Sequence, residues 1–146
     1  MNKKFELLLD DTITIFGIKL FRIKALISFG NVEEGELGGY IEKEDNLSVY
    51  GDAWVYGNAW VYGNAEVYGN ARVYGNADYI VFKNHWSSGR YFTYTKSNKM
   101  WRVGCFYGTG QELINKAYQD SEISGKHYEA YVEFVEKLEK LEETND

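Results

Sequence analysis

The chain has 146 residues, a formal net charge of −6, an aromatic content of 17%, 15 glycines and no proline. This length suits one domain, and the aromatic content argues against disorder. An acidic chain is a poor candidate for nonspecific DNA binding, and no apolar run approaches the roughly 18 residues that a membrane span needs. We therefore expect neither partner. The single cysteine excludes an internal disulfide, which favours a reducing, cytoplasmic setting.

The N-terminal segment has the pattern of three short β-strands. Apolar side chains dominate residues 5–9, and they alternate with polar ones along residues 12–16 and 19–26. Gly17 lies between the second and third runs, where it predicts a tight turn. We expect residues 1–36 to form a small antiparallel meander that caps the following segment.

Five six-residue repeats run without a slip over residues 49–78, as VYGDAW, VYGNAW, VYGNAE, VYGNAR and VYGNAD. Valine suits the inside of a flat β-helix face, alanine suits the junction of two faces, and Gly-Asn suits a corner because both residues tolerate positive φ. The pattern predicts a mainly-β fold with a short left-handed parallel β-helix over residues 37–84. The hand is taken from known hexapeptide-repeat proteins. Tandem hairpins, the alternative, would leave strands of about four residues, too short to pair well.

A β-helix with three repeats in each coil also predicts which residues stack on one another. Tyr56 would lie above Tyr74, and Trp54 above Arg72. The second and sixth residues of each repeat would point outwards, and so aromatic an outer surface is too apolar to lie bare in water. We expect it to contact other copies of the chain, most simply in a homotrimer, or another protein. The residues of this predicted interface are Tyr50, Trp54, Tyr56, Trp60, Tyr62, Tyr68, Arg72 and Tyr74.

The C-terminal part, residues 85–146, is predicted to hold a small sheet and two helices. Strands are expected at residues 79–82, 91–95 and 100–103, with turns at residues 87–90 and 96–99. Thr109 and Glu112 have the spacing of a capping box that opens a helix to about residue 119. A second helix is expected from about residue 124 to 142, with an apolar stripe of tyrosine, valine and leucine.

Basic and aromatic side chains are interleaved from Lys83 to Arg102. Cationic donors beside aromatic rings suit an anionic small molecule such as a nucleotide. We expect such a ligand in a pocket between subunits, and the alternative is a solvated hairpin with ordinary lysines. The predicted ligand-binding residues are Lys83, His85, Trp86, Ser88, Arg90, Tyr91, Tyr94, Lys99 and Arg102.

No residue is assigned a catalytic role. Many hexapeptide-repeat proteins are acyltransferases with a histidine base, and His85 follows the last repeat, but a lone histidine in a surface loop is far commoner. Cys105 precedes a predicted helix and could be a reactive thiolate. We expect it instead to be a small buried residue. The sequence has no metal-ligand spacing, and we expect no cofactor.

Two stretches carry a resemblance to a known family. Residues 20–26 (LFRIKAL) and 37–48 (LGGYIEKEDNLS) resemble the start of small phage and prophage proteins that continue into hexapeptide repeats. Ser88-Gly89-Arg90, residues 105–109 and the acidic last helix are similar to the tail of that family. Val103 stands where such tails often carry a first cysteine, so chemistry of a cysteine pair is not expected. The resemblance implies an accessory role in the cytoplasm of an infected bacterial host, with no reaction attached.

Together these patterns favour a non-catalytic phage binding protein that antagonises host defence by sequestering an anionic small molecule, such as a nucleotide signal. Two alternatives remain open. One is a protein antagonist that binds a host factor through the aromatic face of the repeats. The other is an acyltransferase that binds acetyl-coenzyme A and uses His85.

Overall fold

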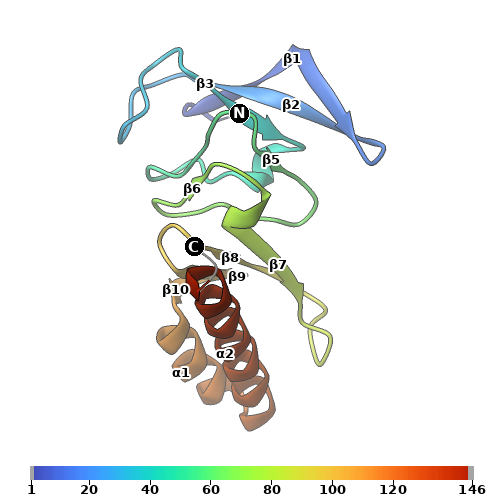
Figure 1. The fold of residues 1–146 in the computed structure, drawn as a ribbon, viewed down its shortest axis with the longest axis vertical. Coiled ribbons are helices and arrows are strands. Elements are labelled where there is room, and N and C mark those ends of the chain that lie inside the picture. Colours follow the sequence, from blue (N-terminus) through green and yellow to red (C-terminus); the bar gives the residue numbers. More distant parts are fainter. Residues whose placement is uncertain (1, 145–146) are drawn as a thin grey trace.

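The computed structural model describes residues 2–144, which form two sheet-based parts stacked along the long axis of the molecule (Figure 1). The first part has a four-stranded sheet in the order β1-β2-β3-β5 and a two-stranded sheet, β4-β6. The second part has a four-stranded sheet in the order β10-β9-β8-β7, with both helices beyond it. The strands are β1 Phe5–Ile15, β2 Ile18–Ala25, β3 Leu37–Ile41, β4 Trp54–Val55, β5 Trp60–Val61, β6 Arg72–Val73, β7 Tyr79–Lys83, β8 Tyr91–Thr95, β9 Met100–Val103 and β10 Phe106–Thr109, and the helices are α1 Gly110–Asp120 and α2 Glu122–Thr144.

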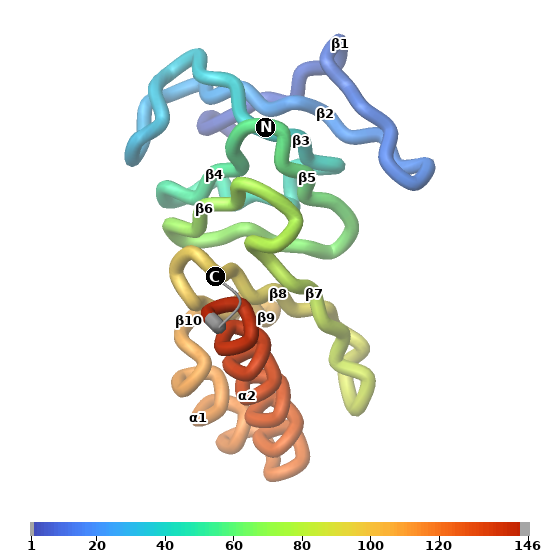
Figure 2. The backbone as a smooth tube through the Cα atoms, in the orientation of Figure 1, coloured from blue at the N-terminus to red at the C-terminus, as the bar shows by residue number. Residues whose placement is uncertain are grey.

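The predicted left-handed β-helix is wrong as a description of this fold. Within residues 2–144, parallel pairing is confined to β3 with β5, β4 with β6, and one isolated bridge, whereas every pair in the second sheet is antiparallel. Each repeat contributes a strand of at most two residues, because turns occupy the remaining positions. A short 3-10 turn, Asn76–Asp78, forms the end of the last repeat and directs the chain into the antiparallel second sheet. The tube in Figure 2 shows the loops of the repeats as one short layer between the two sheets.

Individual features of the repeats do agree with their sequence pattern. Trp54 pairs with Arg72 three repeats later, and the rings of Tyr56 and Tyr74 stack with centroids 4.7 Å apart. The glycines of the first four repeats have positive φ, which the corner required. Most valines and alanines of the repeats form the interior, although Val49 and Ala77 are exposed, and the fully buried valines are Val55, Val61, Val67 and Val73.

The register of the repeats does not continue towards the N-terminus as expected. Ile41 pairs with Val61, and Leu47 bridges to Val67. Each partner lies 20 residues later in the sequence, and not three six-residue repeats later as the repeat register would require. A 3-10 turn, Glu44–Asn46, lengthens this loop. Asn46 is fully buried there, and its amide donates to the carbonyl oxygen of Ala65 at 2.9 Å. In this loop a side chain therefore makes a hydrogen bond of the kind that backbone groups make between neighbouring strands. The repeat pattern did not predict this bond.

The N-terminal strands form the expected antiparallel arrangement above the repeats. β1 is one long strand in place of the two predicted, because a bulge between Leu8 and Thr12 keeps it paired with β2. The turn at Phe16 and Gly17 has positive φ at both residues, as a two-residue hairpin turn requires. β2 then pairs antiparallel with β3, which in turn pairs parallel with β5.

Two adjacent glycines let β3 lie directly on the repeats. A Cβ atom at Gly38 would lie 2.6 Å from the carbonyl oxygen of Val55, and one at Gly39 would lie 2.6 Å from that of Ala59. Real Cβ atoms do not approach backbone oxygen so closely. The Gly-Gly pair within LGGYIEKEDNLS therefore has a packing role.

The three strands and two helices predicted for the second part are confirmed, and β10 was missed. Thr109 caps α1: its side chain accepts a hydrogen bond from the backbone of Glu112, and the Glu112 side chain accepts one in return. Phe92 and Trp101 are buried together with apolar residues of both helices. Neither helix among the described residues combines the length and apolar character that a membrane crossing requires.

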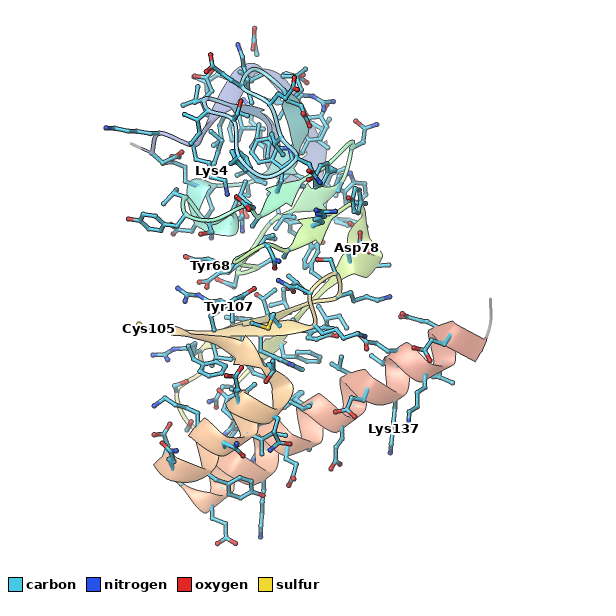
Figure 3. The ribbon with its side chains drawn as sticks, turned by 90° about the vertical axis from the view of Figure 1, so that its left-hand side faces the viewer. Lys4, Tyr68, Asp78, Cys105, Tyr107 and Lys137 are labelled. Atoms are coloured by element: carbon cyan, nitrogen blue, oxygen red, sulfur yellow. The ribbon has the colours of Figure 1, made fainter. Side chains whose placement is uncertain are left out.

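The opposite face of the second sheet closes the end of the repeat layer. The hydroxyl of Tyr107 donates to the carbonyl oxygen of Tyr68 at 3.3 Å, across the junction in Figure 3. Arg102 forms an ion pair with Glu66 at 3.0 Å and lies 4.0 Å from the centre of the Tyr68 ring. β7, which lies within the expected β-helix segment of residues 37–84, belongs to this second sheet.

Candidate functional site

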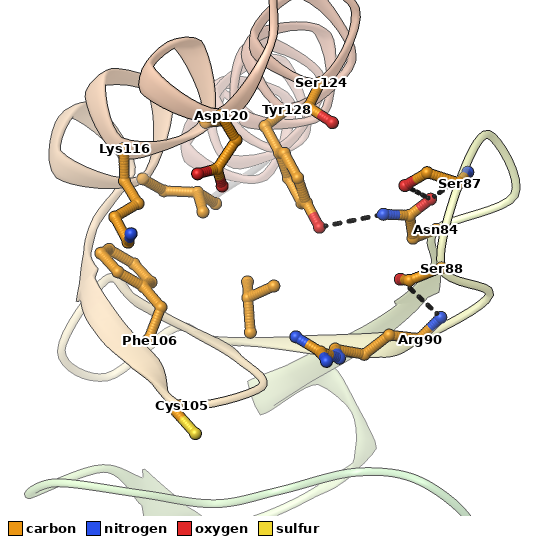
Figure 4. A pocket seen from close by; sticks show the side chains of 13 residues that line it. Asn84, Ser87, Ser88, Arg90, Cys105, Phe106, Lys116, Asp120, Ser124 and Tyr128 are labelled. Atoms are coloured by element: carbon orange, nitrogen blue, oxygen red, sulfur yellow. Dashed lines mark hydrogen bonds between the residues drawn. The ribbon is translucent and has the colours of Figure 1, made fainter.

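A cavity of about 420 Å³ opens between the loop of residues 84–90, the β9–β10 turn and the two helices (Figure 4). Residues from both ends of the second sheet and from both helices meet there. Its walls combine apolar side chains with both signs of charge. The lining residues are Asn84, Ser87, Ser88, Arg90, Val103, Cys105, Phe106, Leu113, Lys116, Ala117, Asp120, Ser124 and Tyr128.

Asn84 organises the loop that forms one wall. Its side chain is buried, with 4% of the residue exposed, and Oδ1 accepts hydrogen bonds from the backbone N–H groups of Trp86 at 3.2 Å and Ser87 at 2.9 Å. Its own backbone N–H donates to the carbonyl oxygen of Arg90 at 2.8 Å, which closes the loop. Arg90 is thereby fixed at the start of β8, beside the cavity.

The inner wall offers hydrogen-bond donors with spare capacity. Asn84 Nδ2 donates to the Tyr128 hydroxyl over 3.4 Å, a long bond that Figure 4 shows crossing the cavity wall. Among residues 2–144 no acceptor is found for the second N–H of Asn84 or for the hydroxyl proton of Tyr128. Burial raises the pKa of Tyr128, and the Asn84 hydrogen bond and the charge of Arg90 oppose that rise. The hydroxyl is therefore a donor at neutral pH.

Two cations approach the cavity from different elements. The Arg90 guanidinium lies over the β9–β10 turn, where a Cβ atom at Gly104 would be 2.3 Å from Nη1. Lys116 extends from α1 on the other side. Within the described part of the chain neither cation has a carboxylate oxygen within 4 Å. Positive charge without a paired carboxylate favours anions, so the chemistry of these two side chains suits a negatively charged group.

Asp120 adds one acceptor to this donor-rich cavity. It lies one turn beyond Lys116 on α1, and its carboxylate points inwards beside Tyr128 in Figure 4. Phe106 and Lys116 lie near it, whereas Arg90 and Ser88 lie on the other side of the cavity. The two sides therefore differ in chemistry.

Cys105 lies at the rim of the cavity and is exposed. The expectation that it would be a small buried residue is wrong. The missed strand β10 explains the difference, because Gly104 and Cys105 form the turn that leads into it, and the thiol projects from that turn.

Of the nine predicted ligand-binding residues, only Ser88 and Arg90 line this cavity. Arg102 pairs with Glu66 beneath the repeats, and Lys99 pairs with Glu139 at 2.9 Å. The Tyr94 hydroxyl also donates to Glu139, inside a second hollow of about 460 Å³ that Glu136 lines as well. These side chains are therefore neutralised by partners that sequence spacing did not reveal.

The other predicted residues of this segment lie outside the cavity. Lys83 is 5.9 Å from the centre of the Tyr91 ring at the exposed end of the hairpin. The Trp86 ring stacks on His127 with centroids 4.4 Å apart, and the His85 ring lies 5.7 Å from His127. His85 is thus part of an aromatic cluster against α2.

The predicted aromatic interface is only partly on the surface. Trp54, expected to point outwards, is fully buried, because the rings of Phe5 and Phe29 pack edge-on against it. Trp60, Tyr56, Tyr62 and Tyr68 are half-buried and Arg72 is exposed. Tyr50 and Tyr74 are 79% and 59% exposed. Among the predicted aromatic interface residues, these two tyrosines are therefore the ones that lie on the surface.

Sequence reasoning missed eleven of the thirteen residues that line the cavity, and four of them carry its main polar groups: Asn84, Lys116, Asp120 and Tyr128. The first and last had no distinctive spacing. Lys116 and Asp120, however, share a helix face with the buried Leu113 and Ala117, at spacings of three and four residues. Charged residues on the inward stripe of an amphipathic helix were the available signal.

No family model matches this sequence, and no curated protein matches it either.

Proposed function

We propose that this protein is a non-catalytic binding protein that captures an anionic small molecule in the cavity between residues 84–90 and the two helices. The observation that carries the proposal is the convergence of Arg90 and Lys116, neither with a carboxylate partner within 4 Å among residues 2–144. The free donors of Asn84 and Tyr128 add neutral hydrogen bonds to the same space.

The size and lining of the cavity fit this role. At about 420 Å³ it lies within the range of small-molecule sites, roughly 300–1,000 Å³. Val103, Leu113 and Ala117 give its lining an apolar part, alongside the charged groups. A ligand would be oriented by its anionic group and held by apolar contact.

The resemblance to phage and prophage accessory proteins supplies the biological setting of the proposal. In that setting the protein would act in an infected bacterium and antagonise host defence by keeping a small molecule from its receptor. Assembly into a trimer belongs to the proposal as well, with Tyr50 and Tyr74 as the contact residues.

Binding can be measured by calorimetry with a panel of phosphate and carboxylate compounds, and a native thiol gives a second readout. Cys105 is the only cysteine in the sequence and lies at the rim, so a bound ligand should slow its alkylation. Arg90→Ala should weaken binding about tenfold or more, because a hydrogen bond to a charged group contributes about 1.5–3 kcal/mol. Lys83→Ala, which removes a cation outside the cavity, is the matched control. Equal binding by both variants, or alkylation that no compound slows, would refute the proposal.

A further inference from the structure

We propose that the ligand is a nucleoside 5′-monophosphate, with its phosphate at the Arg90–Ser88 side of the cavity and its nucleoside at the Asp120–Phe106 side. This inference rests on the proposed function and adds the class of ligand. It follows from the chemical difference between the two sides.

The Arg90 side is suited to phosphate. The planar guanidinium can donate two parallel hydrogen bonds to phosphate oxygens, and its position over Gly104 leaves it facing the cavity. Ser88 stands beside it: its Oγ accepts a hydrogen bond from the Arg90 backbone N–H at 3.1 Å, so its hydroxyl proton is available to the ligand. The Asn84 amide and Tyr128 hydroxyl face the same space. A phosphate monoester accepts from all of these donors.

The Asp120 side has a different requirement. A carboxylate repels a second anion but accepts hydrogen bonds from the N–H and O–H groups of a neutral moiety. The aromatic ring of Phe106 supplies apolar surface on this side, and Val103 and Leu113 also line the cavity. A nucleoside offers both a flat apolar ring and hydrogen-bond donors, whereas inorganic phosphate or a simple carboxylate offers neither.

The volume sets an upper limit on the ligand. A space of about 420 Å³ is at the small end of ligand sites, which suits one nucleotide unit better than two. Lys116, on the same helix face as Asp120, adds a second positive charge to the cavity from the nucleoside side and so increases the attraction for an anionic ligand.

Calorimetry on the full chain should compare AMP, GMP, CMP and UMP with ribose 5-phosphate, adenosine and inorganic phosphate. We expect at least one monophosphate to bind tenfold or more tightly than ribose 5-phosphate and inorganic phosphate, and to give the strongest protection of Cys105. Asp120→Asn should lower the affinity for that nucleotide about tenfold, whereas inorganic phosphate should bind as well or more tightly, because a repelling carboxylate is lost. The control is Glu133→Gln, which removes an exposed carboxylate on α2, outside the cavity.

The outcomes separate the two proposals. If ribose 5-phosphate or inorganic phosphate binds within threefold of every nucleotide, with Arg90→Ala weakening them all, the nucleotide inference fails and anion capture stands. Unchanged nucleotide affinity in Asp120→Asn, with thermal unfolding showing that the variant is folded, also overturns the inference. If no compound binds or protects Cys105, anion capture itself fails.

Discussion

Replacing Gly39 by alanine tests whether β3 lies on the repeats as the structure shows. The new Cβ atom would be 2.6 Å from the carbonyl oxygen of Ala59, 2.8 Å from Cγ1 of Val55 and 3.2 Å from the carbonyl oxygen of Tyr56. Two of these neighbours are backbone atoms, and Val55 is fully buried, so no flexible side chain can move aside.

The cost can be estimated from the contacts that must change. Overpacking a rigid core costs about 1–3 kcal/mol. The Ala59 oxygen also accepts the N–H of Tyr40 at 2.9 Å, and weakening this bond between β3 and β5 adds about 1 kcal/mol. We therefore expect Gly39→Ala to lower the free energy of unfolding by about 2–4 kcal/mol.

Urea unfolding followed by circular dichroism measures this change. Gly75→Ala is the matched control, because Gly75 has an extended backbone with φ of −173° and nothing within 4 Å of an added Cβ atom. This control should be neutral or stabilising by up to about 1 kcal/mol. If the two variants unfold within about 0.5 kcal/mol of each other, the close approach of β3 to the repeats is refuted.

Three further predictions concern other parts of the fold. Lys4 is buried, and its ammonium group donates to the carbonyl oxygens of Ser48 at 2.9 Å and Ala53 at 2.8 Å. Burial lowers the pKa of Lys4 from 10.5 to about 8. Between these two pH values the unfolded chain therefore binds more protons than the folded chain. The free energy of unfolding should therefore rise with pH across that window, which urea unfolding at several pH values measures. The rise should vanish in Lys4→Met and persist in the control variant Lys3→Met. Thr109→Ala should destabilise by about 1 kcal/mol through loss of the α1 cap, with Thr109→Ser close to the original, and equal unfolding midpoints for both would count against the cap. Tyr107→Phe should cost about 1–2 kcal/mol, because Asn98 Nδ2 donates to the lost hydroxyl at 2.7 Å and would keep only its bond to Asn70; a neutral effect would mean that water replaces the hydroxyl.

The second part of the chain was well predicted because its signals are local. Alternating apolar residues and intervening turns identified β7, β8 and β9, and the Thr109–Glu112 capping box identified the start of α1. β10 lacked such a signal, since its four residues follow a turn at Gly104 with little alternation of their own. Its absence from the prediction also hid the exposure of Cys105.

The ligand segment shows why charge patterns along a sequence predict a site poorly. Lys99 and Arg102 looked as available as Arg90, but Glu139 and Glu66 neutralise them from 40 and 36 residues away. Arg90 differs only because the folded chain places no carboxylate within 4 Å of it among residues 2–144. Which cations stay free is a property of long-range pairing.

By itself the sequence determined the elements whose causes lie within a few residues: the strands and turns, the helix cap, and the buried valines and alanines of the repeats. Only the tertiary structure decided that the repeats form one short layer and not a β-helix, that Trp54 lies inside, and that Arg90, Lys116, Asp120 and Tyr128 share a cavity. The physical reason is the same in each case. Local propensity and side-chain period act over a few residues, whereas burial and charge pairing depend on segments that meet only after the whole chain has folded.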